Sequence, residues 1–355
     1  MAALVKSLAA LACAFALIAI ILLALGASSV AVLGALIEGA FGNRLAFTET
    51  IVKATPLVFT GLAISIAFEG ALWNIGAEGQ LIVGALAAGA LGPRLGSWPH
   101  PIAILAMLAG GFMGGALWGG LAGWLKSARH VNEIISTIMM NFIALQILSW
   151  AVHGPLIEPG GAYPKSAPIA AAAELHLYFA PSRLNLGMLL AVILAIASFV
   201  LLYRTTIGLR LRALGRNPRA SRFFGIGIGT LTVGTMALSG ALAGLGGAVQ
   251  VAAITHRLYE TLSPGWGFEA IAVALLARLN PLGVVPCALL FGALDNGSQA
   301  MQRAAGVSPE LVQVIQALVI LILLAFDAGL FVAHRGESGF GCTLPPAGFE
   351  EARDA

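Results

Sequence analysis

Six acidic residues stand inside or beside long apolar stretches of this chain. A charged side chain near the centre of a bilayer costs about 2.5–3.5 kcal/mol on insertion scales, so each should face protein, water or a partner molecule. Such residues are candidates for a translocation pathway. Two are expected at the membrane interface, Glu133 and Asp327, and ion pairing or helix capping is the alternative role for two others. The six are Glu69, Glu78, Glu133, Glu269, Asp295 and Asp327.

A second group of side chains suits a neutral, planar, polar ligand. An aromatic ring offers stacking and amides offer hydrogen bonds. The structural alternative is a tryptophan at the membrane interface and amides that bridge helices. The group consists of Trp73, Asn74, Gln80, Asn141 and Gln146.

Motifs of enzymatic chemistry are missing from the sequence. No Gly-Lys-Ser or Gly-Lys-Thr sequence occurs, so a P-loop is absent, and Gly225 to Gly229 lacks the strand-turn-helix setting of a dinucleotide loop. The six histidines form no metal pair at helix spacing, and the three cysteines lie far apart. No serine or cysteine has the setting of a nucleophile. The sequence therefore predicts a chain without catalytic residues, bound metal or cofactor of its own.

The composition indicates which solvent these residues face. Of the 355 residues, 59% are hydrophobic and only 10% are charged, whereas a soluble domain carries about 25% charge. A bilayer suits such a chain, and the 44 glycines suit close packing of membrane helices. Lys6 precedes an apolar run over 8–25, which is longer than the roughly 7–15 residues of a signal-peptide core. We expect a retained first helix, with a cleaved signal peptide as the alternative.

Apolar segments of bilayer length recur along the chain. They predict an all-α membrane protein of about ten transmembrane helices in two pseudo-repeated halves, within a single domain over 1–335 and a disordered tail over 336–355. Some segments are short or interrupted, and these form either buried short helices or broken hairpins. The expected spans are 8–37, 54–70, 76–93, 101–125, 133–153, 186–203, 228–252, 266–279, 282–301 and 310–333.

The distribution of arginine and lysine sets the orientation. Six arginines fall between Arg204 and Arg222, and no acid occurs between Glu174 and Glu260. We therefore expect residues 204–226 to form a cytoplasmic loop and both termini to be cytoplasmic. A total of eight or nine spans is the alternative to ten. The Gly- and Pro-containing loop over 154–185 is then external, with a short helix expected over 170–177.

Two local patterns suggest how the helices assemble. Trp73 to Gly79 leads into an apolar segment in the first half, and Gly265 to Glu269 does so in the second. Corresponding interrupted segments indicate an inverted repeat around a central pathway, with chance similarity as the alternative. The glycine-rich stretches over 110–123 and 240–247 indicate close helix packing.

The cytoplasmic loop contains a short helix with clear end signals. Asn217 is a suitable N-cap, Pro218 suits the first helical position and Gly225 can end the helix. A short basic helix between two spans is suited to dock on a soluble partner. The alternative is a topology signal that binds lipid headgroups.

This loop resembles the ATPase-docking segment of ABC importer permeases in the branch that handles ribose-type sugars and nucleosides. The branch pattern is Gly-x-Asn-Pro-x-Ala-Ala-x-x-x-Gly-Ile, and this chain matches it from Gly215 to Ile226, with Ser221 as the one departure. Residues 55–80, 132–141 and 270–283 resemble the same family, although Ala277 stands where glycine is more usual. The stretch 154–169 is more similar to nucleoside-type members. Together the resemblance covers roughly residues 50–330.

The resemblance implies a multi-pass permease of the bacterial inner membrane that moves nucleosides or simple sugars. Its protein partners would be an ABC ATPase that binds ATP and Mg²⁺, a second permease that is identical or paralogous, and a periplasmic or lipoprotein binding protein. The chain would also contact membrane lipid, and no nucleic-acid partner is expected. A secondary transporter driven by an ion gradient is the alternative function. ATPase coupling is then expected at Gly215, Asn217, Pro218, Arg219, Ala220 and Gly225. The expected pathway residues are Glu69, Trp73, Asn74, Glu78, Gln80, Asn141, Glu269 and Asp295.

Overall fold

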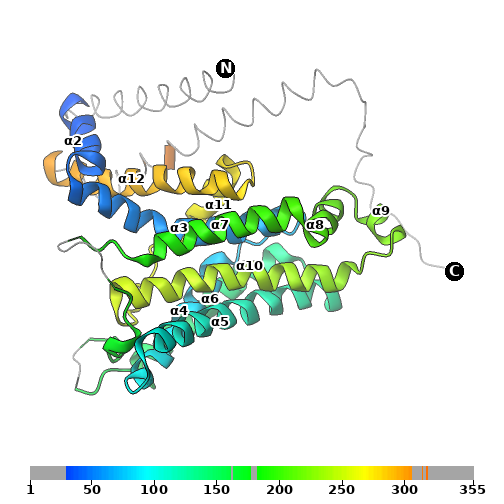
Figure 1. Ribbon diagram of the computed structural model, residues 1–355, viewed down its shortest axis with the longest axis horizontal. Coiled ribbons are helices and arrows are strands. Elements are labelled where there is room, and N and C mark those ends of the chain that lie inside the picture. The colour runs from blue at the N-terminus through cyan, green and yellow to red at the C-terminus, as the bar shows by residue number, and fades with distance from the viewer. Residues whose placement is uncertain (1–28, 161–162, 177–181, 306–313, 315–316, 319–355) are drawn as a thin grey trace.

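A computed structural model describes residues 29–160, 163–176, 182–305, 314 and 317–318. The described part is helical (Figure 1), and its only β-type pairings are two isolated bridges. The helices are α2 (Ser29–Phe41), α3 (Arg44–Glu69), α4 (Ala77–Leu91), α5 (His100–Arg129), α6 (Glu133–His153), α7 (Leu186–Arg204), α8 (Thr206–Arg216), α9 (Pro218–Phe223), α10 (Ile228–Gln250), α11 (Trp266–Leu276) and α12 (Pro281–Ala305).

Five of these helices are long and apolar enough to cross a membrane. They are α3, α5, α6, α7 and α10 with its π-helical extension Val251–Thr255. The prediction of an all-α membrane protein is therefore confirmed. The expected span 8–37 is described only from residue 29, and 310–333 and the tail lie almost wholly outside the described residues. The count of ten spans and the cytoplasmic termini stay predictions.

The largest difference from the predicted spans is the start of α3. It begins at Arg44, ten residues before the expected start, because the Asn43 side chain caps it by accepting from the Ala46 N–H at 2.8 Å. The charge of Lys53 inside this helix is balanced by Asp295 of α12, with 3.0 Å between Nζ and the carboxylate. Lys53, which directly precedes the expected span 54–70, is therefore paired across two helices.

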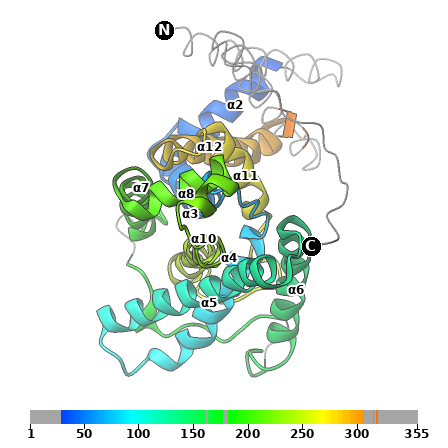
Figure 2. The same ribbon diagram turned by 90° about the vertical axis from the view of Figure 1, so that its right-hand side faces the viewer.

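A glycine seam joins α5 and α10, which lie side by side (Figures 1 and 2). Gly111, Gly115, Gly119 and Gly123 recur every four residues on the face of α5 that meets α10. A Cβ atom on Gly115 would collide with the backbone carbonyl of Gly240. The expectation that these glycines serve close helix packing is confirmed.

Two short helices begin inside the protein rather than at its surface. Gly84 of α4 packs on Gly244 of α10, and Gly247 packs on the backbone of Leu81. This register places the start of α4 about halfway along α10. The start of α11 lies beside the start of α4, since Gly267 packs on the backbone of Glu78. Non-helical backbone at such a depth is tolerated only when protein or an aqueous cavity surrounds it.

The loop over 154–185 folds onto the ends of α4 and α10 where it is described. The Ile169 N–H donates to His256 O at 2.9 Å, and the Leu175 N–H donates to Ala252 O at 2.9 Å. The helix expected over 170–177 is wrong as far as it is described. Only a 3-10 turn over Ala171–Ala173 forms, because the Leu175 N–H bonds to the π-helical turn instead of continuing the helix.

Candidate functional site

The basic segment after α7 is built from two short helices that are anchored on one side. The Thr205 hydroxyl accepts from the Gly208 N–H at 3.2 Å and caps α8. Leu211 and Leu214 are buried, and Gly215 lies so close to Glu69 O at the end of α3 that a Cβ would collide with it. The apolar face of α8 is therefore fixed to the core, whereas Arg216 at the end of the helix is exposed.

The end signals of α9 fall where the sequence indicates them. The Asn217 side chain accepts from the Ala220 N–H at 3.0 Å, and Pro218 occupies the first turn. Gly225 has a φ of 72°, the left-handed conformation that glycine adopts without strain. The Ile226 N–H donates to Ser221 O at 3.1 Å and the Gly225 N–H to Arg222 O at 3.0 Å, which is a Schellman motif.

Ser221, the one departure from the family pattern in this segment, leaves no polar group without a hydrogen bond. Its side chain is buried, and its hydroxyl donates to Asn217 O at 3.0 Å. The serine therefore reinforces the first turn of α9.

Two aromatic side chains at the end of α9 were missed by the sequence reasoning. Phe223 is 93% exposed and Phe224 is 85% exposed. They stand beside the exposed Arg219 and Arg222, so α9 presents apolar rings and positive charge together. Two adjacent aromatic residues after a capped basic helix were the available signal.

The amides expected to bind ligand are brought together inside the protein. Asn74, Gln80 and Asn141 are 0%, 1% and 2% exposed. Asn74 Nδ2 donates to Gln80 Oε1 at 2.9 Å and to Ser239 Oγ at 2.8 Å, and Gln80 Nε2 donates back to Asn74 Oδ1 at 3.0 Å. These bonds fix the segment before α4 to α10. Contact between these amides and a ligand stays a prediction.

Asn141 of α6 completes the support of α4. Its Oδ1 accepts from the Gly79 N–H at 2.8 Å, and its Nδ2 donates to Ile75 O at 2.9 Å. One amide thus satisfies a donor and an acceptor of the irregular backbone. Gln146, on the same helix, is exposed.

The two segments that suggested an internal repeat meet at Glu78. This residue is 2% exposed, and Glu78 Oε2 accepts from the Gly267 N–H at 2.6 Å. Ser263 lies close to the same carboxylate. A carboxylate at the start of α4 therefore caps α11, and it is favoured there by the positive end of the helix dipole. Helix capping was the alternative to a pathway role for Glu78, and the structure shows Glu78 in a capping contact with α11.

The remaining predicted pathway residues lie in two other places. Glu269 of α11 is half-buried, and its charged neighbours are Asp295, Glu78 and Lys53. Glu69 lies at the end of α3, where the Tyr203 hydroxyl donates to it at 3.4 Å. Trp73 is 50% exposed and its ring lies 4.8 Å from that of Phe68.

The acids expected at the interface have separate outcomes. Glu133 starts α6 and forms an ion pair with Lys126 of α5. Asp327 lies outside the described residues. In the described part of the chain, no group of three metal-ligating side chains is placed to hold an ion.

Comparison with known proteins adds the identity of the fold. The family described as "Branched-chain amino acid transport system / permease component" matches residues 46–324. The chain belongs to this permease family. The match covers the described helical part from the first turn of α3 onward, including the basic segment and the glycine seam.

Curated relatives narrow the class of transporter. A guanosine ABC transporter permease protein of Bacillus subtilis is 35% identical and covers 89% of this chain and 92% of its own length. A glucose ABC transporter permease protein of Haloferax volcanii is 33% identical, with 86% and 83% covered. A nucleoside ABC transporter permease protein of Lactococcus lactis is 30% identical, with 87% of each chain covered. This permease is therefore a multi-pass subunit of an ABC importer.

Proposed function

We propose that this permease imports nucleosides across a bacterial inner membrane, and that a separate ATPase drives it through α8 and α9. The exposure of Phe223 and Phe224 on a capped, basic helix carries the proposal. Aromatic side chains and arginine are the residue types that dominate binding energy at protein interfaces. A soluble ATPase subunit that presents an apolar recess with acidic residues around it fits this helix.

The fixed attachment of α8 to α3 suggests how docking reaches the membrane domain. A force on α9 acts on α8, whose Leu211 and Gly215 touch the end of α3. Rigid-body movement of packed helices is a common form of switching. The chain needs no catalytic residue or bound cofactor for this role, because ATP and Mg²⁺ belong to the partner.

The interior polar residues support a pathway near α4 and α11. Both helices begin inside the protein, as the interrupted helices of transporters do where substrate passes. We assign Asn74, Gln80, Asn141 and Glu78 to holding these helix starts. The half-exposed Trp73 and the half-buried Glu269, Asp295 and Glu69 are the side chains we propose to meet the solute or its water.

The substrate class comes from the relatives and from the chemistry of the chain. Two of the three relatives above are named for guanosine or nucleoside and one for glucose. All are neutral polar solutes, for which a ring and hydrogen-bonding groups suffice. A binding protein would deliver the solute at the face of the 154–185 loop, and a second permease, identical or paralogous, would complete the pathway.

The test is uptake by cells or proteoliposomes that contain the complete importer. Labelled guanosine should enter in an ATP-dependent manner, and excess unlabelled glucose should not compete. Arg219→Glu reverses a charge on α9, and Gly225→Pro imposes a φ near −65° where the backbone has 72°. Both should abolish uptake while the protein still reaches the membrane.

Two matched controls make the test specific. Arg94→Glu makes the same charge change at the opposite end of the fold, on an exposed arginine after α4. Gly227→Pro places proline where φ is already −68°. Both controls should keep uptake. Full uptake by Arg219→Glu and Gly225→Pro would refute the docking role, and competition by glucose alone would replace the nucleoside with a sugar.

A further inference from the structure

A cavity of about 460 Å³ opens between α7, α8 and α10, beside the basic segment. Its size lies within the roughly 300–1,000 Å³ of small-molecule sites. Most of its wall is aliphatic, with Leu202, Leu231 and Leu238 among the lining side chains, and the polar side chains on it are Arg210, Thr230 and Thr235. This cavity lies apart from the interior amides and from the exposed tip of α9.

The divergence of α7 and α10 creates the cavity. At the start of α7, Gly187 lies close enough to Val249 of α10 that a Cβ would collide with its side chain. At the other end of α7, Leu201 and Leu202 are separated from Leu231 and Leu238 by the cavity. The two helices therefore form a wedge that is closed at one end and open at the end next to α8.

The faces beside the opening are apolar, as surfaces in contact with lipid are. On α7, Leu189, Ile193, Ile196 and Val200 are 45–55% exposed and repeat at helical spacing. On α8, Ile207 lines the cavity and is itself 54% exposed. The cavity therefore opens between helices whose exposed side chains include many apolar ones.

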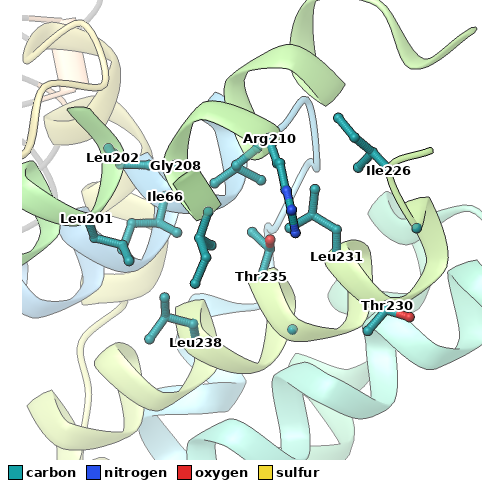
Figure 3. A pocket seen from close by; sticks show the side chains of 14 residues that line it. Ile66, Leu201, Leu202, Gly208, Arg210, Ile226, Thr230, Leu231, Thr235 and Leu238 are labelled. Atoms are coloured by element: carbon teal, nitrogen blue, oxygen red, sulfur yellow. The ribbon is translucent and has the colours of Figure 1, made fainter. Parts of the chain in front are cut away.

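Arg210 supplies the charge at this opening. Figure 3 shows its side chain extending from α8 across the cavity toward Leu231 of α10. No carboxylate pairs with Arg210 among the residues that the structure describes. The sequence offers no acid between Glu174 and Glu260 either. An unpaired arginine beside an aliphatic cavity is complementary to an anionic headgroup with an acyl chain.

We propose that this cavity binds an anionic phospholipid of the cytoplasmic leaflet. One acyl chain lies between α7 and α10, and the phosphate lies at the Arg210 guanidinium, with the Thr230 hydroxyl close by on the cavity wall. The inference rests on the cytoplasmic location of α8, but it requires neither a docked ATPase nor a particular solute.

Gly234 provides a direct way to fill the cavity. It lines the wall, and a Cβ built there meets nothing within 4 Å. Gly234→Leu should therefore occupy the acyl-chain space without disturbing the backbone. Gly34→Leu on α2 is the matched control, because that glycine is equally open and lies on a different helix.

The experiment is native mass spectrometry of the full-length protein in detergent, titrated with phosphatidylglycerol or with phosphatidylcholine of the same acyl chains. We expect wild type to bind the anionic lipid more tightly. Arg210→Gln should remove this preference, a loss of about fivefold for one arginine near a membrane surface. Gly234→Leu should lower the binding of both lipids, whereas Arg94→Gln and Gly34→Leu should leave both unchanged.

Three results would overturn the proposal. Equal binding of the two lipids by wild type would remove the charge recognition. An unchanged preference in Arg210→Gln together with unchanged binding in Gly234→Leu would place the lipid elsewhere. Loss of ATPase co-purification in Gly234→Leu with unchanged lipid binding would assign the cavity to the protein partner.

Discussion

The glycine seam between α5 and α10 and the basic segment of α8 and α9 differ in what their residues contact. In the seam, backbone meets backbone, and Gly115 and Gly240 leave no room for a side chain. At the end of α9, by contrast, Phe223 is 93% exposed and Phe224 is 85% exposed. The seam is complete within one chain, whereas we propose that α9 binds a partner. Substitutions in the seam should therefore change stability, and substitutions at the tip of α9 should change assembly.

The largest effect is expected from Phe223→Ala combined with Phe224→Ala. If both rings are anchors, each truncation costs on the order of 2 kcal/mol of ATPase binding, so the complex should fall apart during purification. The measurement is the amount of ATPase that co-purifies with the tagged permease. Thermal stability of the isolated permease should be unchanged, because the rings pack against nothing.

An aromatic pair away from α9 is the control for this double substitution. Phe41 and Phe47 are also exposed, at 57% and 49%, at the turn between α2 and α3. Their replacement by alanine should leave the ATPase bound. If the two double variants recovered equal amounts of ATPase, the aromatic residues of α9 would not belong to the docking surface.

The next effect is expected in the seam, from Gly115→Ala. One methyl group there meets the Gly240 carbonyl, and overpacking of this kind costs about 1–3 kcal/mol. Thermal unfolding in detergent should begin at a lower temperature. Gly120→Ala on the same helix is the control, since its Cβ would lie 3.4 Å from Ala237, an ordinary contact. Equal stability of the two variants would contradict the tight seam.

The interior amides behave like the seam rather than like α9. Asn74→Ala would remove the hydrogen bonds that the Asn74 side chain makes to Gln80 and Ser239. A buried polar group left without a partner costs about 1–3 kcal/mol. We expect lower thermal stability and a loss of uptake. Gln146→Ala on α6, which removes an exposed amide, should change neither. A stable Asn74→Ala protein with altered solute preference would instead make this amide a ligand group.

The smallest effect is expected from pH at the 154–185 loop. Ion pairs with Arg257, at 2.6 Å, and with Lys165, at 3.2 Å, lower the pKa of Glu158 below its ordinary 4.5. The pair therefore stabilises the loop fully above pH 4.5, and this contribution disappears as pH falls through the lowered pKa. Protease resistance of the loop should decrease in that range.

Glu158→Gln tests this assignment by removing the titrating group. It should make the loop as sensitive at pH 7 as wild type is in acid, with no further change on acidification. Retained pH sensitivity in that variant would assign the effect to another carboxylate.

Much of the fold follows from local sequence. The starts and ends of α5, α6 and α7 match the apolar segments to within a few residues. The caps at Asn217 and Gly225 also match, because capping depends on residues within one turn. The start of α3 was wrong by ten residues, since Lys53 is tolerated only through a partner 242 positions away in the sequence.

The candidate site was predictable in its residues but not in their grouping. The types and spacing of Asn74, Gln80 and Glu78 marked them as unusual in an apolar chain, and residues 217–225 carried the family resemblance. Which of them touch each other depended on helices that are distant in sequence. Asn74 reaches Ser239, and Glu78 reaches Gly267, 189 residues further on.

The sequence by itself determined a helical membrane chain, its likeness to importer permeases and the ends of α9, because bilayer length and capping are local properties. Only the tertiary structure decided that the amides face inward, that Phe223 and Phe224 face outward, and that α7 and α10 diverge around Arg210. Those outcomes depend on which helices pack together. That choice is made by the fit of whole surfaces, as in the glycine seam, and no single segment encodes it.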